Sequence, residues 1–402
     1  MSSVDFLEKL LDGVVVEWKT LGEVSSIKTG QSVNKQMISS NPGEYPVINS
    51  GREPLGFIDE WNTDNDPIGL TSRGAGVGSV TWQEGKYFRG NLNYSVTIKS
   101  PQLFSTRYLY HLLLEMQHEI QALCTYDGIP ALNAGNLKDL LIPIPCPDNP
   151  KKSLEIQAEI VRILDAFTEL TTELTTELTT RKKQYNHYRD QLLSFEDGEV
   201  EWRTLPEMAL DFGRGKSKHR PRNDEKLYGG DIPFIQTGDI RSASHIIMKY
   251  SQNYSAFGLK QSKLWPKGTL CITIAANIAE TSILGFDACF PDSIIGFVAD
   301  PKKTSADYVE YLLQSVKNQL EEKGKEKSSA QSNINLATFE QLKLPFPSIT
   351  EQARIVAILD NFDTLTNSIT EGLPREIELR QKQYEHYRNL LLSFPEQETT
   401  TV

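Results

Sequence analysis

VEWKTLGEV at residues 16–24 returns as VEWRTLPEM at residues 200–208, and this repetition decides how the chain is organised. Two further segments recur, QAEIVRILDAF (157–167) as QARIVAILDNF (352–362) and KKQYNHYRDQLLSF (182–195) as QKQYEHYRNLLLSF (381–394). A period close to half of the 402 residues is far longer than the roughly 20–50 residues of a solenoid or propeller unit. The sequence therefore predicts two whole domains, each followed by a helix.

The stretches between the repeated segments differ from each other. Residues 25–125 and 209–325 share only scattered Gly and Pro residues. A repeated frame around two different inserts is typical of a protein that reads two different things at a fixed separation. An enzyme duplication in which one half has decayed is the alternative interpretation of this pattern.

Each insert has the composition of a mixed α+β module. Short runs rich in Val, Ile, Thr and aromatic residues alternate with Gly, Pro, Asn and Asp clusters, which predicts strands and turns. One amphipathic helix is expected at 105–123 and another at 305–323. Two pairs of prolines then forbid helix continuation and predict an extended exit from each module, Pro143 with Pro145 and Pro345 with Pro347.

Beyond these prolines the apolar residues follow a helical spacing of four and three. The stripe is Ile160, Leu164 (or Ile163), Phe167, Leu170 and Leu174 in one copy, and Ile355, Leu359 (or Ile358), Phe362, Leu365 and Ile369 in the other. We expect two long helices, over 153–195 and 350–392, that pair as an antiparallel coiled coil. Packing of each helix on its own module is the alternative. Gly372 and Pro374 are expected to interrupt the second helix.

The first helix contains TELT three times in tandem, from residue 168 to residue 179. Each four-residue unit lengthens an α-helix by about 6 Å, so the tract changes helix length in modular steps. Replication slippage in a tolerant, solvent-facing helix is the alternative explanation. A weaker copy, LLDGVVVEWKTLGE at 10–23, matches 192–207, which predicts that residues 6–11 lie beside residues 391–394.

Composition excludes several classes of protein. With 39% hydrophobic and 24% charged residues and no apolar run near the roughly 18 residues of a membrane span, the chain has the composition of a soluble protein. The first residues, MSSVDFLEKLLDG, lack the basic region and cleavage site of a secretory signal, so we expect a cytoplasmic location. The four cysteines form no C-x-x-C pair and the histidines show no metal-ligand spacing, so no metal site is expected.

The net charge of −11 is unusual for a protein that binds nucleic acid, because Lys and Arg supply most of the affinity for phosphates. The charge is unevenly distributed. From residue 155 to residue 177 six acidic residues face one base, Arg162, whereas GRGKSKHRPRNDEK at 213–226 is strongly basic. Positive charge is therefore local, and the helix is not expected to be a DNA surface.

Motifs for catalysis are weak or incomplete. SRGAGVGSV at 72–80 misses the dinucleotide-binding glycine pattern by one position, and GRGKS at 213–217 lacks the first glycine of a phosphate loop. No adjacent prolines are present for the base-holding motif of an adenine methyltransferase. The remaining enzymatic alternative is a Mg²⁺-dependent nuclease that uses Asp292, Asp300 and Lys302.

Residues suited to DNA recognition gather on Gly-rich turns in both inserts, since Arg pairs with guanine edges, Asn with adenine, and cations with phosphates. In the first insert the candidates are Arg52, Ser72, Arg73, Trp82, Arg89, Asn91, Asn93 and Tyr94. In the second insert they are Arg214, Lys216, Ser217, Lys218, His219, Arg220, Arg222, Gln236, Thr237, Asn277, Lys327, Ser328 and Gln331.

The duplicated helical segments resemble the specificity subunit of a type I restriction-modification system, in the subfamily with tetrapeptide repeats in its central helix. The resemblance covers both helices and the entry to each module. It implies an α+β fold with two target recognition domains in a pseudo-two-fold arrangement, at 1–150, which includes a short N-terminal helix, and at 198–348. A central spacer helix is expected at 151–197, and a C-terminal spacer helix with a tail at 349–402. A pure assembly scaffold without sequence preference remains an alternative.

The same resemblance implies a function. It describes a non-catalytic subunit that reads a bipartite site in double-stranded DNA, with the helices setting the spacing of the half-sites. Its partners would be two methyltransferase subunits, with a restriction subunit as a further possible partner. The methyl-donor site would belong to the partners, and no cofactor is expected in this chain.

Overall fold

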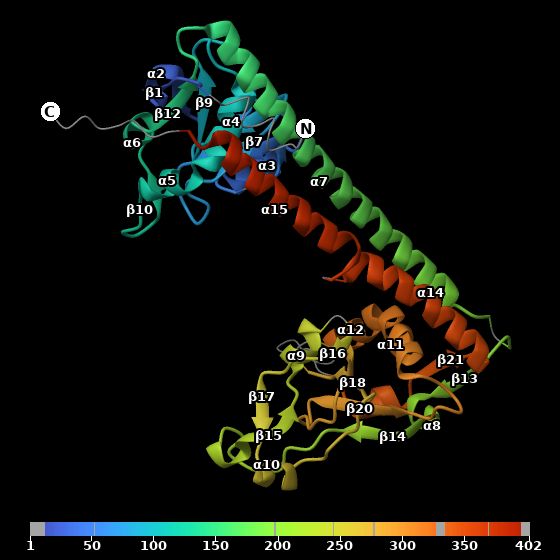
Figure 1. Cartoon of the computed structure of the whole chain (residues 1–402). Coiled ribbons are helices and arrows are strands. Elements are labelled where there is room, and N and C mark those ends of the chain that lie inside the picture. The colour runs from blue at the N-terminus through green and yellow to red at the C-terminus, as the bar shows by residue number, and fades with distance from the viewer. Residues whose placement is uncertain are drawn as a thin grey trace. The chain divides into compact units, whose positions relative to one another are not determined.

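The computed structural model describes residues 13–51, 53–196, 198–243, 245–275, 278–326, 334–368 and 370–394. The chain forms two compact units (Figure 1). The N-terminal unit comprises Met1–Thr172 with Leu379–Val402, and the C-terminal unit comprises Glu173–Glu378. Each unit therefore contains one module and parts of both long helical segments. In the described residues, no helix has the length and apolar character needed to span a membrane.

Two four-stranded sheets form the module of the N-terminal unit. The first is antiparallel, in the order β2 (Ser25–Thr29), β9 (Asn93–Ile98), β6 (Ile68–Thr71) and β7 (Val80–Trp82). The second has the order β4 (Phe57–Ile58), β3 (Tyr45–Ile48), β8 (Lys86–Arg89) and β5 (Thr63–Asp64). The remaining elements are α3 (Lys35–Ser40), α4 (Thr106–Glu115), α5 (Gln117–Ala122), the hairpin of β10 (Cys124–Thr125) with β11 (Ala131–Leu132), and α6 (Ala134–Lys138).

A five-stranded sheet forms the centre of the C-terminal module. Its order is β14 (Ala209–Arg214), β20 (Ile294–Ala299), β18 (Leu270–Thr273), β19 (Thr281–Leu284) and β16 (Ile246–Ile247). A two-stranded sheet pairs β15 (Tyr228–Phe234) with β17 (Gln252–Tyr254). The remaining elements are η1 (Glu225–Leu227), α9 (Thr237–Ser242), α10 (Ala256–Lys260), α11 (Ala306–Ser315), α12 (Lys317–Glu326) and α13 (Leu336–Glu340). Both modules are α+β, as the sequence predicts.

The repeated segments build the same entry and exit in both units. Strand β1 (Val16–Thr20) pairs antiparallel with β12 (Leu141–Pro145), and β13 (Glu201–Thr204) pairs antiparallel with β21 (Lys343–Phe346). Trp18 lies opposite Pro143 in the first pair, and Trp202 lies opposite Pro345 in the second. The prolines are tolerated because a two-stranded ribbon leaves one edge of each strand unpaired. The predicted extended exits are confirmed.

A one-turn helix follows each entry strand, α2 (Leu21–Val24) in one unit and α8 (Leu205–Met208) in the other. Both begin with a capping box, in which the carboxylate three residues into the turn accepts the backbone N–H of the capping threonine. The distances are 2.7 Å from Thr20 N to Glu23 and 2.7 Å from Thr204 N to Glu207. The cap directs the next leucine into the core of its unit.

The long helices are α7 (Pro150–Leu192), of 43 residues, and the pair α14 (Ile349–Asn367) and α15 (Gly372–Leu392). Gly372 begins α15 with a φ of 74°, a left-handed conformation that favours glycine. A Cβ atom there would also collide with the carbonyl oxygen of Thr364. The predicted interruption of the second helix is therefore confirmed. Ile369 lies outside the described residues.

Within each unit the two long helical segments pack against each other. Phe167 of α7 stacks on Tyr387 of α15 in the N-terminal unit, with ring centroids 5.1 Å apart. In the C-terminal unit Phe362 of α14 stacks on Tyr188 of α7 at 5.6 Å. Phe167 and Phe362 are equivalent positions of the repeat, as are Tyr387 and Tyr188. Between the two stacks the residue number rises along α7 from 167 to 188 and falls along its partner from 387 to 362. The predicted antiparallel pairing is confirmed.

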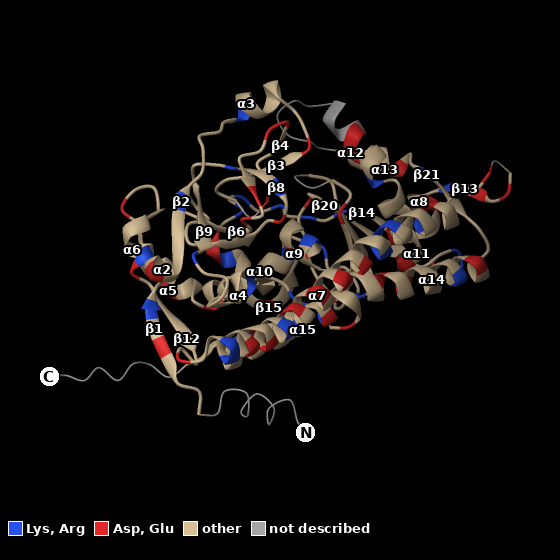
Figure 2. Ribbon diagram, turned by 90° about the horizontal axis from the view of Figure 1, so that it is seen from above, with Lys and Arg blue, Asp and Glu red and all other residues tan. Residues whose placement is uncertain are grey.

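The surface of α7 is mixed in charge, with Asp and Glu along much of its length (Figure 2). Three of its seven cations, Arg162, Arg181 and Arg189, form ion pairs with acids of the same helix. Arg162 donates to Glu159 at 2.6 Å, and Arg181 donates to Glu177 at 2.7 Å. The expectation that residues 6–11 lie beside residues 391–394 concerns residues outside those that the structure describes.

Candidate nucleic-acid interface

Backbone hydrogen bonds join the loops of the N-terminal module into one surface. Ser72 N–H donates to Leu92 O, Leu132 N–H donates to Ser72 O, and Gly74 N–H donates to Pro130 O, each at 2.9 Å. The loops between β6 and β7, between β8 and β9, and between β10 and β11 are therefore held together. We call residues 49–51, 72–79, 90–93 and 125–132 the N-terminal loop platform.

Asn49 and two glycines allow the segment 49–51 to lie close to the loops 72–79 and 90–93. The buried side chain of Asn49 accepts the backbone N–H of Leu92 at 2.9 Å. A Cβ atom on Gly90 would collide with the Asn49 side chain, and one on Gly76 would lie 2.9 Å from Ser50 O. The glycines are required by close approach of the backbones, which the sequence alone does not distinguish from turn glycines.

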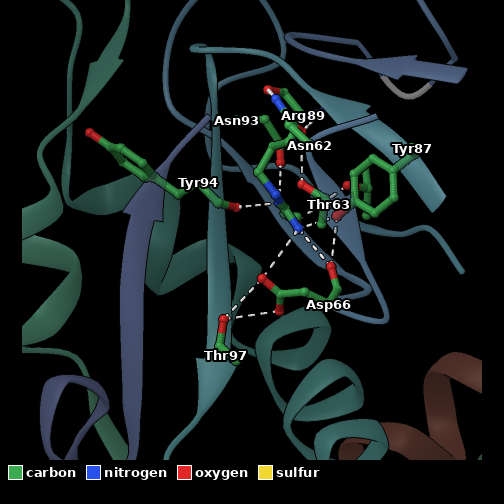
Figure 3. Close-up of polar contacts among 10 residues, drawn as sticks. Asn62, Thr63, Asp66, Tyr87, Arg89, Asn93, Tyr94 and Thr97 are labelled. Atoms are coloured by element: carbon green, nitrogen blue, oxygen red, sulfur yellow. Dashed lines mark hydrogen bonds and ion pairs between the residues drawn. The ribbon is translucent and has the colours of Figure 1, made fainter. Parts of the chain in front are cut away.

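A buried arginine supports the platform from beneath (Figure 3). Arg89 is 3% exposed and donates to Asn93 Oδ1 at 2.5 Å, to Tyr94 O at 3.0 Å and to Asp66 O at 2.7 Å. Asn62 accepts the backbone N–H of Arg89 at 2.7 Å. Burial lowers the pKa of the Arg89 guanidinium from its usual value, against the opposing effects of Tyr87 and Asp66.

This network corrects two sequence-based predictions. Arg89 and Asn93 were expected to contact DNA, but their side chains are 3% and 0% exposed and are hydrogen-bonded to each other. Removing a buried, hydrogen-bonded cation from these partners would leave several polar groups unsatisfied. Both residues therefore position the strands. Ser72, also predicted, is buried and contributes its backbone.

The other N-terminal candidates separate into two places. Arg73 and Asn91 are exposed on the platform, and the partly buried Tyr94 donates its hydroxyl to Leu132 O at 3.1 Å. Trp82 lies elsewhere, since its ring packs 5.0 Å from that of Tyr110 and its Nε1 donates to Glu84 at 2.9 Å. The prediction that Trp82 joins the other candidates is wrong. Arg52 lies outside the described residues.

Trp82 belongs to the junction between the module and the long helices. Asp165 of α7 accepts a hydrogen bond from Arg107 at 2.8 Å and contacts His111 Nε2 at 2.7 Å. Arg388 of α15 donates to Glu115 at 2.5 Å. Burial lowers the pKa of His111, although its contact with Asp165 opposes that shift.

The C-terminal unit has a simpler junction at the equivalent position. Asp360 occupies the place that Asp165 has in the repeat, and it accepts a hydrogen bond from Tyr311 at 2.6 Å. Burial, followed by this hydrogen bond to a carboxylate, raises the pKa of the Tyr311 hydroxyl. The repeated aspartate therefore anchors each module to its helix through different partners.

The basic segment of the C-terminal module, residues 213–226, begins at the end of β14. Arg214, Lys216 and Lys218 are exposed, and among the described residues no hydrogen bond or ion pair occupies their side chains. Arg222 instead donates to Asp292 at 2.7 Å, and Arg220 donates to Ser217 O at 2.6 Å. Lys226 is likewise exposed and its side chain forms no ion pair with a described residue, so Arg220 and Arg222 are the cations of this segment that are occupied by other described residues.

Two predicted residues of this segment have internal contacts. Ser217 is buried, so its side chain is not available at the surface, which corrects the expectation of a DNA contact. His219 contacts Asp224 at 2.7 Å, and its ring packs against Phe257 at 5.2 Å. The backbone N–H of Lys226 and then the contact with His219 lower the pKa of Asp224. These contacts fix the shape of the segment.

The remaining C-terminal candidates are less informative. Gln236, half-buried, donates to Gln252 at 3.0 Å, and Thr237 follows it at the start of α9. Neither is hydrogen-bonded to the basic segment. Four candidates lie outside the described residues: Asn277, Lys327, Ser328 and Gln331.

The nuclease alternative is wrong on geometric grounds. Asp292 lies in a turn before the extended strand β20 and Asp300 directly after it, so the six residues of the strand, at about 3.3 Å each, hold them roughly 20 Å apart. Asp292 is paired with Arg222, and Asp300 with Lys303 at 3.4 Å. In the described ranges, no group of three or more His, Cys, Asp or Glu side chains could hold a metal ion.

Sequence reasoning missed the tip of the β10–β11 hairpin. Tyr126 is 61% exposed and Ile129 is 70% exposed, on the edge of the N-terminal loop platform. The available signal was YDGIP at 126–130, a turn with Gly and Pro between two short strands. This segment contains neither Lys nor Arg, so its sequence gives no sign of DNA binding.

Comparison with known proteins gives one consistent result. The model of the family described as "Type I restriction modification DNA specificity domain" matches residues 15–181 and 201–379. The Escherichia coli type I restriction enzyme EcoR124I/EcoR124II specificity subunit is 36% identical over 419 residues, covering 100% of both chains. A putative type I restriction enzyme specificity subunit of Haemophilus influenzae is 33% identical, covering 97% of this chain and 98% of that one.

Solved structures show the same fold. The crystal structure of a type I restriction-modification S subunit from M. genitalium matches with a TM-score of 0.58 at 18% identity, covering 96% of this chain and 97% of that one. A chain from a structural study of complex assembly and conformational transition of the type I system matches with a TM-score of 0.62 at 13% identity, covering 94% and 97%.

Proposed function

Because this chain belongs to the family of type I restriction-modification specificity subunits, we propose that it is the DNA-reading subunit of such a complex. Each module reads one half of a bipartite site in double-stranded DNA. The chain itself is non-catalytic, and adenine methylation is the work of two partner methyltransferase subunits, with a restriction subunit joining where one is present. The complex acts on cellular DNA in the cytoplasm.

The observation that carries the proposal is a repeated frame with unlike contents. The entry and exit strands, the capping boxes and the Phe–Tyr stacks recur in both units. The sheets between them differ in number of strands and order. A scaffold without sequence preference would have no use for two different loop surfaces on equivalent frames.

The two surfaces are suited to different contacts. On the N-terminal loop platform, Arg73 can pair with a guanine edge and Asn91 with an adenine edge. In the C-terminal module, Arg214, Lys216 and Lys218 are free to neutralise phosphates. The net charge of −11 is compatible with this function if the partner subunits supply the other phosphate contacts around the duplex.

The TELT tract is proposed to set the spacing between the half-sites. The division between the two units falls inside it, between Thr172 and Glu173. Leu170, Leu174 and Leu178, one from each TELT unit, are half-buried. Thr168 and Thr172 donate their hydroxyls to carbonyl oxygens four residues earlier, at 3.1 and 2.8 Å, so these hydroxyls are satisfied within the helix itself.

The test is to produce the chain with its methyltransferase subunits and map methylated adenines in DNA by single-molecule sequencing. The expected result is one motif of two separated halves with a fixed spacer. A contiguous motif would contradict reading by two modules. An assembled, active complex that methylates without sequence preference would show that the chain is a scaffold.

A further inference from the structure

The hairpin tip, residues 125–131, is joined to the loop that carries Arg73. Arg73 forms a β-bridge with Ala131, and Gly74 N–H donates to Pro130 O at 2.9 Å. Leu132 N–H donates to Ser72 O at 2.9 Å. The tip therefore does not move independently of Arg73, and both belong to the same edge of the N-terminal loop platform.

Local contacts fix the conformation of the tip without burying its large side chains. Thr125 donates its hydroxyl across the hairpin to Ala131 O at 3.2 Å, and Tyr126 donates to Gln121 O at 3.4 Å. Gly128 has a φ of 90°, and no atom lies within 4 Å of the position of a Cβ atom there. Glycine is thus required by the turn and not by packing.

The side chains of the tip are arranged for contact with something outside the chain. Tyr126 and Ile129 are 61% and 70% exposed on the same five-residue turn. Single exposed apolar residues are common on protein surfaces and mark nothing by themselves. Tyr126 and Ile129 form a pair, separated by three positions in the sequence. The hydrogen bonds of the platform hold both in place beside the exposed Arg73.

The charge of the tip indicates which part of DNA it would meet. From Cys124 to Ala131 there is no Lys or Arg and one acid, Asp127, so the tip is unsuited to phosphates. Base edges offer the matching chemistry, since an apolar side chain contacts the thymine methyl group and a carboxylate accepts from the cytosine amino group. The ring of Tyr126 offers apolar surface for contact of the same kind.

We propose that the hairpin tip is a base-reading element of the N-terminal module, in which Tyr126 and Ile129 contact base edges in a groove beside Arg73. The inference rests on the proposed function of DNA reading and deepens it. It assigns sequence discrimination in this half-site partly to apolar contacts. Arg73 supplies the adjoining polar contact.

The test uses the full complex with its methyltransferase subunits and a duplex that carries its own bipartite site. Tyr126→Ala and Ile129→Ala should each weaken binding about tenfold. The slope of log affinity against log salt should stay unchanged, because no phosphate contact is lost. Ile129→Ala should also relax the preference at one base pair of the N-terminal half-site and leave the other half-site as it was.

Two control variants accompany these. Leu141→Ala shortens a 46% exposed apolar side chain on β12 of the same unit, away from the platform, and should leave affinity and motif unchanged. Tyr126→Phe keeps the ring and removes only the hydroxyl that donates to Gln121, so it should bind nearly as the parent does. Unchanged hydrogen exchange in the variants would verify folding.

Several outcomes would overturn the proposal. Unchanged affinity and motif in both alanine variants would remove the tip from the interface. A salt slope reduced by about one unit would indicate a phosphate contact instead. Loss of assembly with the methyltransferase subunits would show that the tip contacts a protein partner. If the parent complex assembles but reads no bipartite site, the proposed function fails together with this inference.

Discussion

In the N-terminal unit β1 pairs with β12 and Phe167 stacks on Tyr387, and in the C-terminal unit β13 pairs with β21 and Phe362 stacks on Tyr188. Between these matching contacts one module has two four-stranded sheets and the other a five-stranded sheet with a small two-stranded one. The contacts that recur in both units are the pairing of the entry strand with the exit strand and the ring stack between the two long helical segments. The part of each module that is not involved in these recurring contacts is its loop surface.

The junctions of the two modules show how much variation the frame tolerates. Asp165 binds Arg107 and His111, whereas the equivalent Asp360 binds Tyr311. Each aspartate keeps a donor from the helix of its own module. Because different donors can bind the repeated aspartate, the sequence of a module can change while its point of attachment to the helix stays the same.

The largest expected effect concerns the buried leucines of the helix stripe. Leu164 and Leu359 occupy equivalent positions, and both are 0% exposed. Leu164→Ala and Leu359→Ala should each lower the free energy of unfolding of the unit concerned by about 2–5 kcal/mol. Native-state hydrogen exchange should show the loss of protection in the N-terminal unit for the first and in the C-terminal unit for the second. Equal losses in both units from either variant would contradict separate cores.

Deleting residues 172–175 should shift the preferred spacer by one or two base pairs. The deletion shortens α7 by about 6 Å, against about 3.4 Å per base pair of duplex. The apolar stripe is displaced by only about 40°, since four residues turn an α-helix by roughly 400°. Methylation mapping would measure the spacer. Deletion of two residues, which moves the stripe much further, serves as the control and should abolish activity.

An unchanged spacer after the four-residue deletion would show that the tract is slippage and does not set the distance. Such a result would not affect the conclusion that two different modules occupy one repeated frame. It would contradict only the proposal that α7 sets the spacing of the half-sites.

The basic segment should contribute through its free cations. Lys216→Ala and Lys218→Ala should each flatten the salt dependence of DNA binding by about one unit, because one phosphate contact is lost. Arg222→Ala is the matched comparison, since Arg222 is already paired with Asp292 and should change the slope less. Binding measured from low to high salt gives the slopes. Unchanged slopes in both lysine variants would exclude the segment from the interface.

The smallest expected effect is a difference in pH dependence between the units. Burial lowers the pKa of His111 below 6.5, so its neutral form is favoured, and stability is lost as the pH falls from 6.5 through the lowered pKa. Asp307 and then Glu310 raise the pKa of His245 from 6.5 to about 10, so stability is full below 6.5 and is lost as the pH rises toward 10.

Thermal unfolding followed over this pH range should separate the two effects. His111→Gln should remove the acid component and His245→Gln the alkaline component, each in its own unit. Identical pH profiles for parent and variants would show that neither histidine changes its protonation on folding.

The repeats predicted the two modules and the apolar spacing predicted the helix pair, while the paired prolines predicted the extended exits and Gly372 with Pro374 the break in the second helix. They could not predict that Arg89 and Asn93 are buried, since a polar residue of a strand looks the same whether it faces solvent or an internal hydrogen-bond network. Trp82 was misplaced for a similar reason. Its neighbours Tyr110 and Arg107 come from α4, which the sequence does not locate relative to β7.

The central claim is that two independent readers occupy one repeated frame, and exchange of a single insert tests it most directly. Residues 20–150 would be replaced by the corresponding segment of a relative with a different methylation motif, and methylated adenines would then be mapped in the assembled complex. The account predicts that one half of the motif changes to that of the relative while the other half and the spacer stay the same. A change in both halves would contradict it.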